Sequence, residues 1–103
     1  MKTLVVLFNL KPGVTAAEYE RWATATDLPT VRSLPSVRSF ELYRAEGVLG
    51  SEAASPYAYV EFIDCLSLET LFADIGTPLM QHVAAEFQAF ARDPLFIITE
   101  RCS

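Results

Sequence analysis

Three side chains of this sequence have the chemistry to move protons: Asp27, Glu61 and His82. Asp27 lies in Thr26-Asp27-Leu28-Pro29, inside a segment that has the pattern of an amphipathic helix. Apolar neighbours raise the pKa of a carboxyl group, which can then act as a general acid or base. The alternative is that Asp27 caps a second helical segment whose first turn contains Pro29.

His82 is the single histidine, and histidine titrates near neutrality without help from its surroundings. Helical spacing puts it off the apolar stripe of Val83 and Phe87 and near Glu86, which favours a surface pair. The interruption Gly76-Thr77-Pro78 leaves open that His82 turns toward the mouth of a cavity. One histidine excludes a His-rich metal site, so we expect no metal.

Trp22 and a set of strand residues are candidates for binding a substrate. Trp22 could stack on a flat heteroaromatic ligand, or it could belong to the core. If alternation holds through each strand, one sheet face is polar and carries Asn9, Glu41, Tyr43, Tyr59, Glu61, Thr99 and Arg101.

This polar face would line either a ligand cavity or a dimer seam. Tyr43, Tyr59 and Glu61 are the best candidates for ligand contact, because phenols and a carboxylate can bind pyrrole or indole N–H groups. Together with Asn9 and Trp22 they make up the predicted binding set.

These residues must be positioned by four strands and two helices. Strands are predicted over residues 3–11, 37–45, 57–64 and 95–101. One helix starts at the capping box Thr15 to Glu18, and a second starts at Ser67, breaks at 76–78 and ends at Asp93-Pro94. The order βαββαβ predicts an α+β, ferredoxin-like domain over residues 1–103, with a four-stranded antiparallel sheet and two helices on one face.

Both faces of this sheet carry apolar side chains. In the first strand Val6 and Phe8 share one face, yet Val5 and Leu7 on the other are apolar too. A sheet covered by helices on one side should be polar on the other. We therefore expect a homodimer whose sheets pack face to face or close into a barrel.

Composition narrows the class of protein. The chain has 103 residues, 51% hydrophobic side chains and a net charge of −5, which disfavours nucleic acid and anionic membranes as partners. No run approaches the length of a membrane span, and no signal peptide is expected. Cys65 and Cys102 lack CxxC spacing, so we expect reduced cysteines and a cytoplasmic protein.

Three short segments resemble the EthD-type pattern of the dimeric α/β-barrel superfamily. They are Tyr19-Glu20-Arg21-Trp22, Thr26-Asp27-Leu28-Pro29 and Leu34-Pro35-Ser36-Val37. Asp27 stands where that pattern has histidine, and Ser36 where it has glycine. Over nearly its whole length the chain more closely resembles the REDY-like (HapK-type) proteins of prodigiosin-type pigment pathways.

The resemblance implies a cofactor-independent enzyme acting on a pyrrolic or indolic intermediate, with Asp27, His82 or Glu61 moving protons during condensation, dehydration or tautomerisation. Two alternatives stay open: a non-catalytic carrier that delivers a reactive intermediate to another pathway enzyme, and a cofactor-free monooxygenase. No GxGxxG or other cofactor signature is present, and a lone His82 is a weak axial-ligand candidate. We therefore expect no cofactor.

Overall fold

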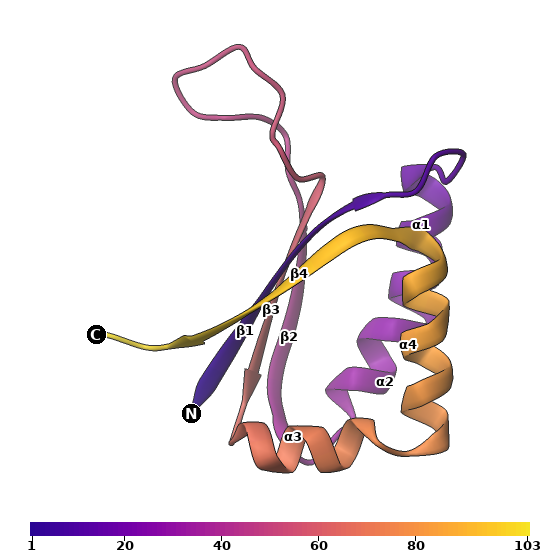
Figure 1. Ribbon diagram of the computed structural model, residues 1–103, viewed down its shortest axis with the longest axis vertical. Helices are drawn as coiled ribbons and strands as arrows, with labels where there is room; N and C mark the ends of the chain where they lie inside the picture. The colour runs from indigo at the N-terminus through magenta and orange to yellow at the C-terminus, as the bar shows by residue number, and fades with distance from the viewer.

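The computed structural model describes residues 1–103 and has the predicted ferredoxin-like order (Figure 1). Its antiparallel sheet has the strand order β2-β3-β1-β4, built from β1 (Lys2–Leu10), β2 (Val37–Arg44), β3 (Tyr59–Cys65) and β4 (Ala91–Glu100). The helical segments cover one side of it and are α1 (Ala16–Trp22), the π-helix η1 (Ala23–Asp27), α2 (Leu28–Arg32), α3 (Leu68–Ile75) and α4 (Pro78–Phe90). None of the helices has the length and apolar character needed to cross a bilayer.

The helices start where the sequence predicts. The hydroxyl of Thr15 accepts the Glu18 N–H at 3.1 Å, and the hydroxyl of Ser67 accepts the Thr70 N–H at 3.1 Å. Such caps satisfy amide groups that a helix leaves unpaired at its start. The break at residues 76–78 is also confirmed, because Thr77 caps a new helix that begins at Pro78.

The end of the last helix differs from the prediction. The sequence places it at Asp93-Pro94, whereas α4 ends at Phe90 and β4 begins at Ala91. The register of β4 on β1 shifts between Leu7 and Asn9, which leaves Asp93 and Pro94 opposite one residue as a bulge. Asp93 has φ +48, and a bulge on an edge strand is where a sheet tolerates a proline.

An aromatic cluster joins the sheet to the helices. The fully buried Phe8 ring lies 5.4 Å from the rings of Tyr19 and Tyr59 and 5.0 Å from that of Phe87. Burying one such side chain stabilises a fold by about 1.5–3 kcal/mol. The cluster fills one end of the space between the layers and fixes the distance of α1 and α4 from the sheet.

The strand register corrects the predicted polar face. Tyr59 pairs with Phe8 and Glu61 with Val6, so both face the helices. Glu41, Tyr43, Asn9 and Thr99 belong to the opposite face, and Arg101 lies beyond β4. The prediction was wrong because the register between antiparallel strands, which alternation along one strand does not reveal, decides which residues share a face.

The face of the sheet turned away from the helices is largely apolar, as the sequence pattern indicates. Val5 pairs with Phe62 and Ile97, and Leu7 pairs with Leu95. The side chains of Phe62, Leu95 and Ile97 are 39%, 46% and 43% exposed. Below, this surface is called the open sheet face.

Candidate active site

A cavity of about 420 Å³ lies between the helices and the sheet. Fourteen of its eighteen lining residues are hydrophobic, and the other four are Asp27, Glu61, Gln81 and Gln88. This size and this mixture of many apolar walls with few polar groups are typical of small-molecule sites. The cavity therefore brings together two of the three residues predicted to move protons.

A π-helical turn positions Asp27. The Leu28 N–H donates to the carbonyl of Ala23, five residues earlier, so η1 widens the helix between α1 and α2. Pro29 has no N–H to offer the preceding turn, and a widened turn accommodates that loss. The capping interpretation is wrong: Asp27 has helical angles, φ −65 and ψ −56, and its side chain makes no cap hydrogen bond. Its carboxyl group is left free to line the cavity.

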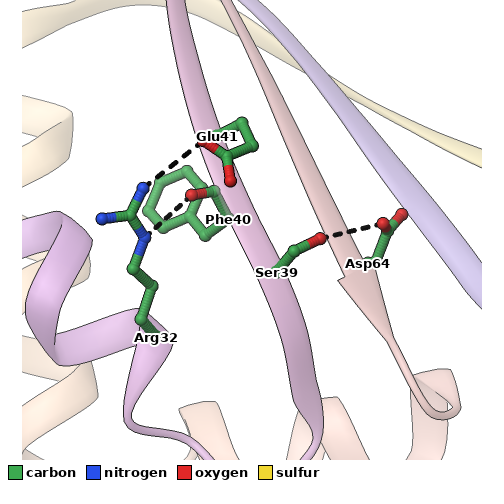
Figure 2. Close-up of polar contacts among 5 residues, drawn as sticks. All are labelled: Arg32, Ser39, Phe40, Glu41 and Asp64. Atoms are coloured by element: carbon green, nitrogen blue, oxygen red, sulfur yellow. Dashed lines mark hydrogen bonds and ion pairs between the residues drawn. The ribbon is translucent and has the colours of Figure 1, made fainter.

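Arg32 fastens the same helical segment to the edge of the sheet (Figure 2). Its Nε donates to the carbonyl of Phe40 at 3.0 Å, and its guanidinium lies 3.5 Å from the Glu41 carboxylate. Because β2 is an edge strand, this carbonyl faces α2 and not another strand. The contact holds α2 against β2 where Val31 and Phe40 line the cavity. It therefore fixes the helix that follows Asp27.

Figure 2 also shows how β2 is tied to its neighbour. The hydroxyl of Ser39 donates to the Asp64 carboxylate of β3 at 2.9 Å, and the Thr3 hydroxyl of β1 donates to the same carboxylate. These bonds to its charged form hold the pKa of Asp64 below its usual range. The three strands that carry the floor of the cavity are thus cross-linked on the open sheet face.

The electrostatics of the cavity are set by burial. Asp27 is 7% exposed and Glu61 3%, and no lysine, arginine or histidine lines the cavity. Burial raises the pKa of Asp27 to about 7. Burial and then repulsion from Asp27 raise the pKa of Glu61 to about 8. The two carboxyl groups therefore exchange protons near neutral pH, as general acids and bases require.

Two buried polar atoms near this pair lack hydrogen-bond partners, the Glu61 Oε1 and the Tyr19 hydroxyl. Burial, together with the charges of Glu61 and Asp27, raises the pKa of Tyr19, which keeps the phenol protonated. Buried polar atoms usually have partners, and those without them often mark a functional site. Sequence reasoning placed Tyr19 on an apolar helix face and gave its hydroxyl no role.

Gln81 and Gln88 were also missed. They lie seven residues apart on α4, so both face the cavity beside Ala84. The Gln81 amide donates to the carbonyl of Ile75 at 2.9 Å and helps to hold α3 to α4. Polar residues at helical spacing within an apolar stripe were the signal that could have identified them.

Trp22 and Tyr59 do not line the cavity. The Trp22 ring packs 5.2 Å from that of Phe90, so the alternative of a core tryptophan fits the packing. Tyr59 is buried, and its hydroxyl donates to Glu20 at 2.7 Å. Both therefore serve the framework around the site, and we leave them out of it.

His82, Asn9 and Tyr43 lie elsewhere on the molecule. The His82 Nε2 is exposed and 3.7 Å from the Glu86 carboxylate, which is the surface pair that helical spacing favoured. The Asn9 amide donates to the carbonyl of Pro56 and accepts the Ala58 N–H, so it fixes the chain before β3. Tyr43 is 56% exposed on the open sheet face. These three predicted site residues are not brought to the cavity.

The buried carboxyl pair makes a prediction about stability. The ordinary pKa values of Asp27 and Glu61 are 3.8 and 4.5, so between pH 4 and 8 the folded chain binds more protons than the unfolded chain. Their contribution should lower the free energy of unfolding as pH rises through this range, by roughly 3 kcal/mol. In urea unfolding at several pH values, Glu61→Gln should flatten this slope and be more stable than the wild type at pH 8. The exposed Glu86→Gln is the control, and a Glu61→Gln slope as steep as its slope would contradict the assignment.

Comparison with known proteins places this architecture. The family model "REDY-like protein HapK" matches residues 2–102. The crystal structure of HapK from Hahella chejuensis is 28% identical, with a TM-score of 0.79 over 98% of this chain and 92% of that one. A comparison with curated protein sequences finds no match.

More distant structures share the fold. SnoaB, a cofactor-independent oxygenase from Streptomyces nogalater, is 16% identical, with a TM-score of 0.76 over 99% of this chain and 93% of that one. A dimeric ferredoxin-like protein from Thermobifida fusca is 20% identical, with a TM-score of 0.71 over 97% and 90% of the two chains. The family model spans nearly the whole sequence, and the chain thus belongs to the REDY-like HapK family.

Proposed function

We propose that this protein is a cofactor-independent enzyme that moves protons on a small, flat, apolar molecule. The observation that carries the proposal is a pair of buried carboxyl groups, Asp27 and Glu61, lining one apolar cavity. Burying ionisable groups without cations costs stability, and proteins accept this cost mainly at functional sites. Gln81 and Gln88 would orient polar groups of the substrate from α4.

The two carboxyl groups suit opposite roles. The pKa of Glu61, raised to about 8, keeps it protonated at neutral pH, so it would act as the general acid. Asp27, with a pKa of about 7, is ionised in a large share of molecules and would act as the base. The proton taken up by Asp27 and the one given by Glu61 balance in a tautomerisation, and in a dehydration the departing hydroxyl leaves as water.

The substrate we propose is a pyrrolic or indolic intermediate of prodigiosin-like natural-product biosynthesis, handled in the cytoplasm. The support is family membership and the match between an apolar cavity of about 420 Å³ and a flat heteroaromatic ring. A ring N–H can donate to a carboxylate, and the Glu61 Oε1 has no partner within the protein.

Turnover of a panel of bipyrrole and indole aldehydes tests this proposal. Product formed by the wild type, followed by mass spectrometry, should fall at least about 100-fold in Asp27→Asn and in Glu61→Gln, because general acid–base catalysis contributes about 10²–10⁴-fold. His82→Gln is the matched control and should keep full activity, since His82 is exposed outside the cavity.

The same assay separates the other two hypotheses. Binding with an unchanged ligand mass would point to a carrier that passes the intermediate to another pathway enzyme. The fold shared with SnoaB supports a cofactor-free monooxygenase as the second candidate, for which oxygen uptake with substrate alone is the expected signal. Either outcome would contradict the proton-transfer proposal.

We further propose that the protein is a homodimer that packs through the open sheet face. Apolar side chains line this face, and the dimeric relative from Thermobifida fusca has the same fold. Ile97→Glu would place a charge in the interface and should yield a monomer in analytical ultracentrifugation, whereas the wild type is a dimer. Leu49→Glu changes a fully exposed leucine of the β2–β3 loop and should stay dimeric. A dimeric Ile97→Glu protein would contradict this interface.

A further inference from the structure

The cavity has a one-sided inventory of charge. Its only lining residues that can ionise are Asp27 and Glu61, and both can carry only negative charge. The two arginines that flank this side of the molecule are already engaged, Arg32 with Phe40 and Glu41 and Arg44 with Glu20 at 2.9 Å. No cationic group is therefore positioned to receive a carboxylate or phosphate of a ligand.

The rest of the cavity suits a flat ring. Phe72 of α3 and Phe96 and Ile98 of β4 line it and are 59%, 52% and 56% exposed, so part of its apolar wall is open to solvent. At the buried side Glu61 is 3% exposed, and its Oε1 has no hydrogen-bond partner. An incoming ligand would thus meet apolar surface first and an unpartnered carboxyl oxygen last.

We propose that this cavity selects a planar ligand that carries a basic nitrogen, bound as its cation against Asp27 and Glu61. The inference rests on the proposed function, because it takes the same cavity as the substrate site, and it adds the charge of the substrate. A ligand cation supplies the positive charge that the protein itself does not place beside the pair. An uncharged analogue of the same shape lacks this attraction, and an anion is repelled.

Binding of a cation should also release a proton. The other ionisable groups around the pair are Tyr19, Tyr59 and Glu20, all neutral or acidic, while α3, α4 and β4 contribute no charged side chain to the cavity. At neutral pH the pair still holds protons. When a cation binds, a carboxyl group ionises and its proton passes to the buffer, so that charge balances within the cavity.

Isothermal titration calorimetry with three naphthalene probes tests the inference. The amine 1-naphthylmethylamine, the alcohol 1-naphthalenemethanol and the acid 1-naphthoate share one ring and differ in charge. For the wild type at pH 7 we expect the amine to bind at least about tenfold more tightly than the alcohol, with the acid weakest. The heat of amine binding, measured in two buffers of different ionisation enthalpy, should show net proton release.

Variants locate the selectivity. Glu61→Gln and Asp27→Asn keep the side-chain shape, so they should bind the alcohol as the wild type does and lose most of the preference for the amine. His82→Gln should keep that preference. The proton-release measurement needs no variant and holds even if one of them folds poorly.

The outcomes separate this inference from the proposed function. Equal binding of amine and alcohol without proton release, or tightest binding of the acid, would overturn the charge selectivity and leave the catalytic proposal standing. Amine selectivity in a protein that turns over no aldehyde would support the inference and contradict the enzyme proposal. If none of the three probes binds, the cavity does not admit flat ligands and both proposals fall.

Discussion

The burial of two carboxyl groups without a cation is the constraint that shapes the rest of this molecule. Asp27 and Glu61 lose water and gain no neighbouring positive charge, so each holds its proton to a higher pH than an exposed carboxyl group does. A pair of apolar side chains of similar size would be more stable there. The fold tolerates the pair because the aromatic cluster around Phe8 and the cross-linked strands supply stability elsewhere.

Two independent devices bring the carboxyl groups to one cavity. The π-helical turn places Asp27 on the inner side of the first helical segment, and Arg32 then fastens that segment to β2. The register of β3 on β1 puts Glu61 beside Val6, on the helix-facing side of the sheet. Because one device is local and the other depends on strand pairing, the site forms only when helix and sheet are both in place.

The sequence predicted the element order, the caps at Thr15 and Ser67 and the break before Pro78, since these depend on local patterns. It identified Asp27 from a proline next to a carboxylate within a helix, although it could not show that the turn is a π-turn and not a cap. It grouped Glu61 with residues of the opposite face, because the register between strands is a tertiary property. The role of the Tyr19 hydroxyl was likewise hidden, since a tyrosine on an apolar helix face reads as core until its neighbours are known.

The most direct test of this account is an NMR titration of the side-chain carboxyl carbons of Asp27 and Glu61 between pH 3 and 10. The account predicts that both titrate above pH 6, and that Asp27→Asn lowers the pKa of Glu61 because it removes the neighbouring negative charge. Titration of both groups near pH 4, with no effect of Asp27→Asn on Glu61, would contradict it.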